Sequence, residues 1–481
     1  MKLAGLQPSR VWYYFEEICG VPHPSKKEAK IRVYLKELGC KLGVETVETE
    51  VGNIIYRKPA SKGFENLKVV TLQAHMDMVP SKAPTSKHNF ETDPIELEVI
   101  GDLVKAKETT LGADNGIGVA MILALMESTD IPHGPLEALI TVDEETGMTG
   151  AFGLKAGELT GEILLNLDSE DDDEVCIGCA GGIDTNVSIP TTLAPVLTGS
   201  VAYHLVIKGL FSGHSGVDIH MGRINAIKEM ANALYEMKKN FNIKLVNIVG
   251  GTLRNVIPAK CDAQFVVEEK YASDLEQFIK QYEENLKTEY GEVEKKLSFG
   301  AEKIATPTHY IAESGKIILA IEASFFGVHK MDWNVNIPET SSNFGAIKTL
   351  DGSVECIFLT RSPMAHAKEK VANMIAATYE LIGAKVVHTG AYPGWLPNVH
   401  SSILKTVKEG YLKLYSEEIH VAATHGGLEC GLIQGVYPQM EAVSIGANIR
   451  YPHSINEEVS ISSVEKSWEF LKYILAHIDA K

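Results

Sequence analysis

Two kinds of hydrophobic segment alternate along the first part of the chain. Residues 67–78, 135–145 and 162–170 are nearly continuous apolar runs that end in polar residues, as buried strands do. Between them, residues 31–43 and 117–129 have the character of helices, and a helical turn is expected at 151–157. Apolar strands interleaved with helices predict an α/β fold with a mixed, mostly parallel sheet flanked by helices.

The pattern changes between about residues 186 and 388. Strand-like segments (200–210, 260–270, 353–361, 385–390) succeed helical ones (224–240, 273–291, 313–327, 365–383), and the order repeats once. Segments 254–269 and 342–361 each place an Asn and a hydrophobic residue before a strand. We interpret this as an internal duplication, with two α+β lobes at roughly 186–297 and 298–388.

From about residue 389 the first pattern returns. Helices are expected at 400–416 and 461–478, and residues 440–460 run from a strand into a loop. A chain of 481 residues is too long for one ordinary core. The prediction is one catalytic α/β domain built from residues 1–185 and 389–481, interrupted by an inserted α+β lid domain at 186–388.

Composition narrows the class of protein. Hydrophobic residues make up 45% of the chain and charged residues 22%, which is typical of soluble globular proteins. The net charge of −18 argues against nucleic acid and anionic membranes as partners. No apolar run reaches the ~20 residues of a membrane span, and the N-terminus lacks the features of a signal peptide.

The seven cysteines are scattered and odd in number, which favours reduced thiols in a cytoplasmic protein. Cys176 and Cys179 form a CxxC pair, but no second pair or paired histidine accompanies it. We therefore expect it to have neither a metal nor a redox role.

Acidic and imidazole side chains gather at the predicted strand ends. His75 and Asp77 end one strand, Asp143 to Glu145 end another, Asp168 ends a third, and Asp114 lies in a glycine-rich turn before a helix. Sites in α/β sheets form at the carboxyl ends of strands, so these groups are candidates for one site.

Each of these signals also has a structural interpretation. Asp77 could orient His75 toward a metal, or the two could be unrelated polar residues. Asp114 could bridge two cations or cap a helix. Glu144 and Glu145 could have separate roles in proton transfer and metal binding, or they could form a solvated acidic turn. Asp168 could simply cap the segment that follows it. Taken together, the mixed N and O donors suit Zn²⁺, with Mn²⁺ or Co²⁺ as alternatives.

These motifs resemble those of the M20 clan of dinuclear zinc peptidases, specifically the aminoacyl-histidine dipeptidase (peptidase D, Xaa-His dipeptidase) branch. The resemblance runs nearly end to end. It includes VPHPSKKE, AHMDMVP, GADNGIG, DEETGMTGA, NLDSE, GCAGG, GLFSGHSGVDIHMGRINA, THGGLECGL and RYPHS. GADNGIG and GHSGVDIHMGRINA are specific to that branch, since the sister tripeptidases differ around the bridging aspartate.

The resemblance implies two divalent metal ions per chain and assigns a role to each residue. One ion would bind His75, Asp114 and Asp168, and the other Asp114, Glu145 and His453, with Asp114 as the bridge and a cis Asp114–Asn115 peptide bond. Glu144 would be the general base and Asp77 the carboxylate that orients His75. The pattern of the chain alone does not single out His453 among 16 histidines.

In the lid, the resemblance implies that His214 and Asn255 stabilise the oxyanion, Arg361 binds the substrate carboxylate and Gly427 makes a backbone contact beside it. Without the resemblance, His214 is a loop residue and Arg361 a surface charge. Glu429 is a candidate receptor for the substrate ammonium, and Cys430 a packing residue. His220 and Arg223 are expected to have a structural or interface role.

The expected function is metal-dependent hydrolysis of unblocked dipeptides, of the Xaa-His type or with broader specificity. A zinc-bridging water would be the nucleophile and Glu144 its base. The alternatives are a deacylase or carboxypeptidase acting on N-acyl amino acids, and a non-catalytic metal-binding scaffold, which the loss of Glu144 or a ligand would favour. The resemblance allows a homodimer, although a duplicated lid could supply His214 within one chain.

Overall fold

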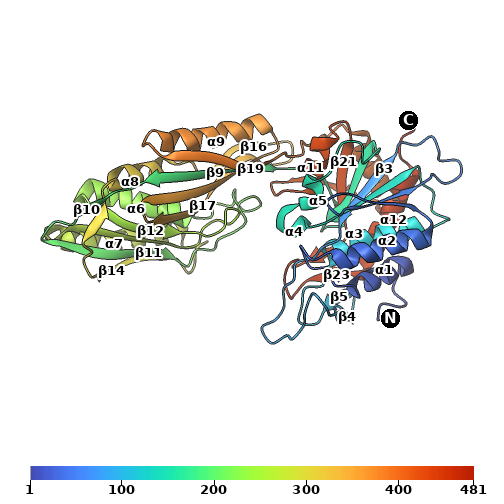
Figure 1. Cartoon of the computed structure of the whole chain (residues 1–481), viewed down its shortest axis with the longest axis horizontal. Coiled ribbons are helices and arrows are strands. Elements are labelled where there is room, and N and C mark those ends of the chain that lie inside the picture. The colour runs from blue at the N-terminus through green and yellow to red at the C-terminus, as the bar shows by residue number, and fades with distance from the viewer. Residues whose placement is uncertain (1) are drawn as a thin grey trace. The chain divides into compact units, whose positions relative to one another are not determined.

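The computed structural model describes residues 2–481, which form two compact units (Figure 1). The α/β unit comprises the chain through Gly178, Trp395–Ala423 and Leu428–Lys481. The inserted unit comprises Cys179–Gly394 and Thr424–Gly427. The predicted insertion at 186–388 is thus extended on both sides, because the residues on either side continue strands of its sheet. A short segment near residue 425, predicted to belong to the α/β domain, also packs with the inserted unit.

An eight-stranded sheet forms the centre of the α/β unit in the described chain, with the order β1-β2-β6-β3-β7-β21-β8-β20. Its strands are β1 (Glu45–Glu48), β2 (Ile54–Lys58), β3 (Val70–His75), β6 (Leu136–Thr141), β7 (Ile163–Ser169), β8 (Glu174–Cys179), β20 (His420–Thr424) and β21 (Glu441–Gly446). A small sheet, ordered β22-β23-β5-β4, accompanies it. Its strands are β4 (Leu97–Ile100), β5 (Leu103–Ala106), β22 (Ile449–Arg450) and β23 (Glu458–Ser460).

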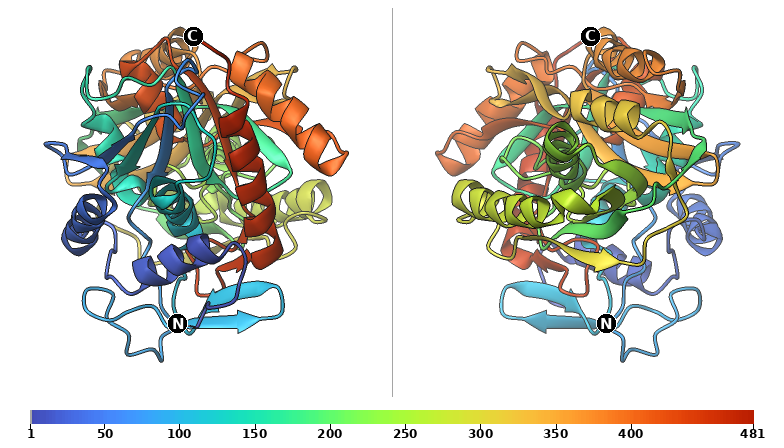
Figure 2. Two further views of the ribbon diagram at one scale, coloured as in Figure 1. Left: turned by 90° about the vertical axis from the view of Figure 1, so that its right-hand side faces the viewer. Right: turned by 90° about the vertical axis from the view of Figure 1, so that its left-hand side faces the viewer.

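The four central strands β6, β3, β7 and β21 are parallel, while β1–β2, β2–β6 and β8–β21 are antiparallel pairs. Every residue of β3 and β6 is buried, as expected for parallel strands covered on both faces. Helices flank the sheet (Figure 2). These are α1 (Ser9–Cys19), α2 (Ala29–Leu42), α3 (Ala113–Glu127), α4 (Glu144–Gly147), α5 (Thr149–Phe152), α10 (Ser402–Tyr415), α11 (Glu429–Val436) and α12 (Ile461–Ala476). The predicted α/β fold is confirmed.

The inserted unit is built on one antiparallel nine-stranded sheet within the described residues. Eight strands follow the order β14-β11-β13-β12-β17-β18-β9-β19, and β16 pairs with β17. The strands are β9 (Gly181–Pro190), β11 (Ser200–Lys208), β12 (Lys244–Gly250), β13 (Cys261–Glu268), β14 (Ser298–Ile304), β16 (Gly327–Asp332), β17 (Ile337–Leu350), β18 (Ser353–Ser362) and β19 (Lys385–Tyr392). A short pair, β10 (Leu193–Pro195) and β15 (His309–Ile311), lies outside it.

Helices of this unit share one apolar core with the sheet. They are α6 (Ala226–Phe241), α7 (Ala272–Tyr290), α8 (Ser314–Ala323) and α9 (Ala365–Glu380), with a 3-10 turn, η1 (Glu269–Tyr271), before α7. Buried and half-buried residues alternate along much of β9 and β11, as in sheets with one covered face.

The two predicted lobes lie in a single continuous sheet rather than in two. The two halves of this sheet meet where β12 pairs with β17, at Val249 with Lys348 and Gly250 with Ile347. β9, whose second half falls in the predicted first lobe, instead pairs with β18 and β19 of the second. The predicted boundary at residue 297 is also too early. β14 begins at Ser298 yet pairs with β11, so the boundary lies after Ile304. The short, partly exposed pattern of β14 gave no signal of which lobe it joins.

No helix in residues 2–481 combines the length and the apolar character that crossing a lipid bilayer requires.

Glu137 ties the sheet together at the amino ends of its central strands. It is 2% exposed, and its carboxylate accepts hydrogen bonds from Thr71 Oγ1 at 3.1 Å and Gly161 N at 3.0 Å. Thr160 donates through both its backbone N and its hydroxyl, and Arg57 through Nε at 3.2 Å. One buried carboxylate therefore satisfies donors from β2, β3 and the turn before β7.

We predict that Glu137→Ala lowers the free energy of unfolding by about 1–3 kcal/mol, because the buried donors of Thr71, Thr160 and Gly161 lose their acceptor. Urea unfolding of the full chain measures this. Glu50→Gln, which removes an exposed partner of Lys155, should leave the unfolding midpoint where it is. An unchanged midpoint for Glu137→Ala would contradict this role.

Candidate functional site

The carboxyl ends of the parallel strands bring the predicted acids and His75 together. His75 is the last residue of β3 and is 1% exposed. Asp168 lies within β7, one residue before its end. Glu144 and Glu145 were expected at a strand end, but they open the short helix α4. Asp143, with φ of 50°, turns the backbone between β6 and α4, and Asp tolerates this left-handed conformation better than most residues.

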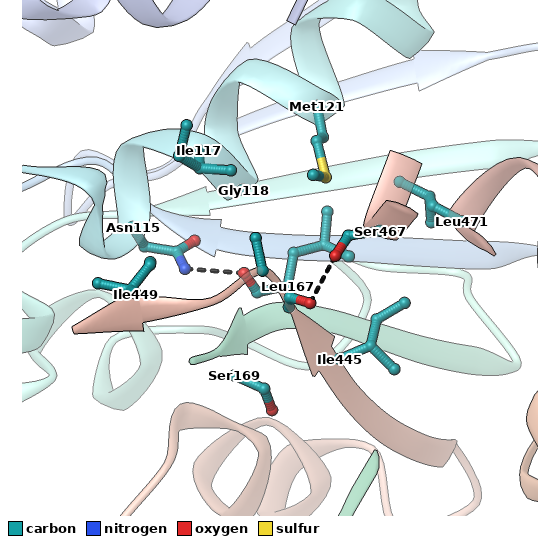
Figure 3. Close-up of a pocket in the computed structure, with 12 residues that line it drawn as sticks. Asn115, Ile117, Gly118, Met121, Leu167, Ser169, Ile445, Ile449, Ser467 and Leu471 are labelled. Carbon is teal, nitrogen blue, oxygen red and sulfur yellow. Dashed lines mark hydrogen bonds between the residues drawn. The ribbon is translucent and has the colours of Figure 1, made fainter. Parts of the chain in front are cut away.

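Asp114 lies at the start of α3, in a turn that the protein holds firmly. The Asp114–Asn115 peptide bond is cis, as the resemblance implies. Asn115 Nδ2 donates to Leu167 O at 2.8 Å, which ties the turn to β7 beside Asp168 (Figure 3). The buried Glu457 carboxylate accepts hydrogen bonds from four consecutive backbone N–H groups of this turn, those of Leu111, Gly112, Ala113 and Asp114.

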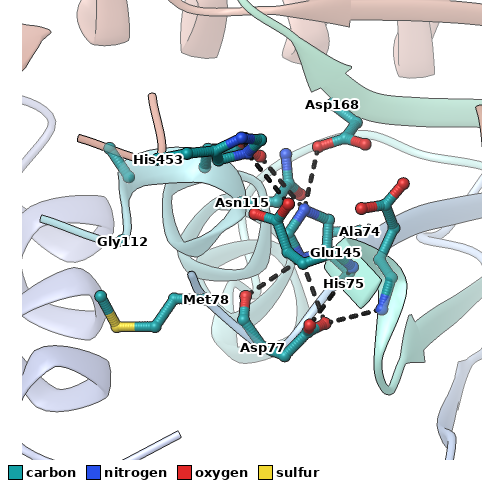
Figure 4. Close-up of polar contacts among 12 residues, drawn as sticks. Ala74, His75, Asp77, Met78, Gly112, Asn115, Glu145, Asp168 and His453 are labelled. Carbon is teal, nitrogen blue, oxygen red and sulfur yellow. Dashed lines mark hydrogen bonds and ion pairs between the residues drawn. The ribbon is translucent and has the colours of Figure 1, made fainter. Parts of the chain in front are cut away.

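The two oxygens of Asp114 face two different histidines. Oδ1 lies 3.1 Å from His75 Nε2, and Oδ2 lies 3.1 Å from His453 Nε2. His75 Nε2 is also 3.4 Å from Asp168 Oδ1, and His453 Nε2 is 2.9 Å from Glu145 Oε2 (Figure 4). The side chains thus form two groups that share Asp114, one with His75 and Asp168 and the other with His453 and Glu145.

Asp77 stands behind His75. Its Oδ1 is 3.4 Å from His75 Nδ1, and its backbone carbonyl is 3.1 Å from the same nitrogen. The Asp77 carboxylate also accepts hydrogen bonds from Glu144 N at 3.0 Å and Glu145 N at 3.4 Å. Burial acts against its charge, but the hydrogen bond and the charge of His75 lower the pKa of Asp77. One carboxylate therefore orients the imidazole and the start of α4.

The electrostatics of the cluster favour positive charge between its carboxylates. Hydrogen bonds to Asp114 and Glu145 raise the pKa of His453 to about 11. Burial alone would lower the pKa of His75, but Asp168, Asp114 and Asp77 raise it well above its usual value. Despite complete burial, the two histidines hold the pKa of Asp114 below its usual range. The carboxylates therefore need nearby positive charge. Protons on the two imidazoles supply it, and bound metal ions would supply it as well.

The donor set fits a pair of metal ions. Buried Glu145 Oε1 and Asp168 Oδ1 accept no hydrogen bond in the described chain, although buried carboxylate oxygens normally do. Burial raises the pKa of Asp168 to about 6 and raises that of Glu145. Two imidazoles and three carboxylates, with one carboxylate common to both groups, are the ligand types that Zn²⁺ and related divalent ions take.

A second group of buried carboxylates, Glu28, Asp77 and Asp143, lies close by. Protein donors engage each of them. Lys26 N donates to Glu28, Glu144 N to Asp77, and the hydroxyls of Thr146 and Thr149 to Asp143. This group braces the turn before α4.

Glu144 opens α4 next to the candidate ligand Glu145, and within residues 2–481 its carboxylate forms no hydrogen bond. Burial raises the pKa of its carboxyl well above the usual value, and the charges of Asp168, Glu429 and Glu145 add to this while His75 opposes it. A carboxylate in this state holds a proton more firmly than an exposed one.

Arg361 lies on β18 of the inserted unit and is 4% exposed. Its guanidinium donates to Ser215 Oγ at 3.3 Å and Tyr392 OH at 3.2 Å, and Nη2 lies 3.4 Å from His214 Nε2. Among the described residues no carboxylate forms an ion pair with it. A buried guanidinium held only by neutral groups retains its need for an anion.

His214 and Asn255 lie on adjoining loops, since Ser215 N donates to Asn255 O at 2.9 Å and His214 bridges to Val256. Burial and the Arg361 charge lower the pKa of His214 to about 4, so it is neutral near pH 7. Gly427 belongs to the segment Thr424–Gly427, which Ala180 N contacts at Thr424 O and Gly426 O. The lid residues therefore gather within the inserted unit.

Sequence reasoning missed several residues that hold these groups. They are Gln73, Thr141 and Glu457 in the α/β unit, and Ser215, Ser341, Tyr392 and His425 in the inserted unit. Glu457 lies shortly after His453 in an irregular loop, and such a loop shows no hydrophobic periodicity that would single it out. Ser215 lies inside the GLFSGHSGVDIHMGRINA motif and His425 inside THGGLECGL, so these two residues had a usable signal.

Three comparisons relate the chain to known proteins. Residues 205–294 match a family model described as a peptidase dimerisation domain of the M20 type. The chain is 40% identical over 483 residues to the cytosol non-specific dipeptidase of Escherichia coli (strain K12), covering 100% of each protein.

Solved structures agree with this. The aminoacylhistidine dipeptidase of Vibrio alginolyticus is 40% identical and superposes with a TM-score of 0.92, covering 100% of this chain and 99% of that one. An aminopeptidase from Bacillus cereus has a TM-score of 0.59 at 18% identity, with 98% of each chain covered, and shares the fold alone. Full-length identity of this degree, with the dimerisation domain in the inserted unit, shows that the chain belongs to the M20 family of peptidases.

Proposed function

We propose that this protein is a metal-dependent dipeptidase that hydrolyses unblocked dipeptides, of the Xaa-His type or with broader specificity. The observation that carries the proposal is the pair of histidine–carboxylate groups that share the Asp114 carboxylate. The full-length similarity to two proteins named as dipeptidases supports the substrate class. The retention of Glu144 and of all five candidate ligands argues against a non-catalytic scaffold.

The candidate ligands divide between two divalent ions, with Zn²⁺ the favoured metal and Mn²⁺ or Co²⁺ the alternatives. His75, Asp114 and Asp168 would hold one ion, and His453, Glu145 and Asp114 the other. When bound, such ions polarise a carbonyl group and lower the pKa of water. Asp77 keeps His75 in the tautomer whose Nε2 is free to bind, because it accepts the proton of Nδ1.

Glu144 acts as the general base. Its raised pKa lets it accept a proton from the attacking water and later give that proton to the leaving amine. Asp77 fixes the start of α4 through the Glu144 backbone N–H, so the base and the His75 ring share one support. Proton transfer by a positioned side chain is worth roughly 10²- to 10⁴-fold in rate.

The inserted unit supplies the groups that hold the substrate. Arg361, buried and without a carboxylate partner, binds the free C-terminal carboxylate of the dipeptide, and the Gly427 backbone contacts it nearby. His214 is neutral and donates an N–H to the developing oxyanion, and Asn255 contributes its amide. A bidentate Arg–carboxylate pair explains a requirement for a free C-terminus.

The matched dimerisation domain supports a homodimer formed through the inserted unit. The relative from Escherichia coli is named as a cytosolic enzyme, which supports a cytoplasmic location for this protein.

A panel of dipeptides tests the function directly. Unblocked Xaa-His dipeptides should be cleaved, their N-acetyl forms should not, and chelation should abolish cleavage until Zn²⁺, Mn²⁺ or Co²⁺ is restored. Cleavage of the N-acylated compounds in preference to the unblocked ones would show that the protein is a deacylase and not a dipeptidase. Full activity after exhaustive chelation would remove the metals from the mechanism.

Glu144→Gln should lower kcat by about 10²- to 10⁴-fold, since the amide cannot take the proton. Metal content, measured on the dialysed protein, should equal that of the wild type, because Glu144 is not a ligand. Glu98→Gln, an exposed change on β4, is the matched control and should behave as wild type. Normal turnover by Glu144→Gln would show that Glu144 is not the general base.

Arg361→Met should raise KM for unblocked dipeptides by about 10- to 100-fold, in line with the loss of a charge-assisted hydrogen bond. Dipeptide amides, which lack the carboxylate, should be affected far less. Lys385→Met, an exposed change on β19, controls for the loss of one cation. Equal losses on acids and amides would show that Arg361 does not read the carboxylate.

A further inference from the structure

Glu429 is a buried carboxylate that the proposed mechanism does not use. It is the first residue of α11 and is 1% exposed. Its Oε2 accepts hydrogen bonds from Gln73 Nε2 at 2.5 Å and from Thr141 Oγ1 at 2.6 Å. Two strands of the central sheet therefore fix the position of this side chain.

The contacts of Glu429 place it beside His75. Gln73 precedes His75 by two residues on β3 and so points to the same face of the sheet. Thr141 is the residue of β6 that pairs directly with His75. The negative charge of Glu429 also acts on Glu144. Glu429 therefore lies in the layer of side chains next to the candidate metal ligands and the base.

The second oxygen of Glu429 is unsatisfied. Oε1 is buried and accepts no hydrogen bond within residues 2–481. Beside it, Glu145 Oε1 and Asp168 Oδ1 accept no hydrogen bond either, and the proposed metal ions account for both; Asp168 Oδ1 also lies 3.4 Å from His75 Nε2. Outside this site, Glu294 has one such oxygen as well. An unpaired buried carboxylate oxygen is costly unless a ligand completes it.

A count of charges points to the kind of ligand, and this step rests on the proposed function. Two divalent ions would balance the charges of Asp114, Glu145, Asp168 and Glu144. Asp77 already receives hydrogen bonds from the His75 Nδ1–H and from two backbone N–H groups. Within residues 2–481, Glu429 has only the neutral donors of Gln73 and Thr141, both on Oε2, so its Oε1 lacks a positively charged partner.

An unblocked dipeptide carries such a charge at the right place. Its α-ammonium nitrogen is two bonds from the scissile carbonyl carbon, or about 2.5 Å. Any group that binds the ammonium must therefore adjoin the catalytic side chains, as Glu429 does. We propose that Glu429 Oε1 accepts a hydrogen bond from the substrate α-ammonium and so selects dipeptides with a free N-terminus.

The alternative is that Glu429 only positions Gln73 and Thr141. Glu429→Gln separates the two roles, because the glutamine carbonyl oxygen can still accept from Gln73 and Thr141 while the charge is lost. The probes are alanyl-histidine and its desamino analogue propionyl-histidine, which differ only in the ammonium group. Steady-state kinetics on the metal-loaded enzyme give the preference, the ratio of the two kcat/KM values.

We expect Glu429→Gln to lower kcat/KM for alanyl-histidine by about 10- to 100-fold, mainly through KM, with little change for propionyl-histidine. The preference for the free amine should fall by the same factor. Glu429→Asp, which keeps the charge, should retain more of the preference. Glu294→Gln is the matched control, because Glu294 is also a buried acid with one oxygen held, by Phe211 N, and one unpaired.

An unchanged preference in Glu429→Gln, or equal losses on both substrates, would overturn the proposal and leave Glu429 a positioning residue. Thermal melting of the variants distinguishes loss of folding from loss of binding. If Glu429→Gln does not fold, the preference for the free amine is compared between Glu429→Asp and the wild type, and an unchanged preference in Glu429→Asp, whose shorter side chain moves the charge, would count against the proposal. If the wild-type enzyme cleaved no dipeptide at all, the proposed function itself would fail, and this inference with it.

Discussion

The site depends on the position of one carboxylate, that of Asp114. It faces His75 with one oxygen and His453 with the other, and these residues come from opposite ends of the chain. The turn that carries it is held by Glu457 from the C-terminal segment and by the hydrogen bond from Asn115 to Leu167 of β7. Because Glu457 and His453 lie in the same loop, the hydrogen bonds of Glu457 hold Asp114 and the loop of His453 together.

A cluster of this kind is unfavourable without cations. Burial acts against the charges of Glu144, Glu145 and Asp168, and the histidines relieve them only by holding protons. Bound divalent ions would replace those protons and leave Glu144 to exchange one with the substrate. The same logic extends to Glu429, whose free oxygen lies beyond the reach of any described donor. Substrate charge and metal charge together would complete the balance of the site.

Much of the α/β unit followed from the sequence, because apolar runs such as that of β3 leave few alternatives to a buried parallel strand. The strand ends also pointed to His75, Asp77 and Asp168. His453 and the lid residues came from resemblance, since a histidine in a polar loop has no periodic signal. Local pattern could not place Glu144 on a helix, join β14 to β11, or find Glu457, because each depends on contacts between distant segments.

Two metal ions that share Asp114 would explain both the arrangement and the charge of the site. Anomalous diffraction from crystals grown with Zn²⁺, recorded on both sides of the zinc absorption edge, locates the ions without reference to activity. Two peaks are expected, each about 2.0–2.2 Å from a different Asp114 oxygen, one next to His75 and Asp168 and the other next to His453 and Glu145. A single peak, or peaks that leave Asp114 uncoordinated, would contradict this explanation.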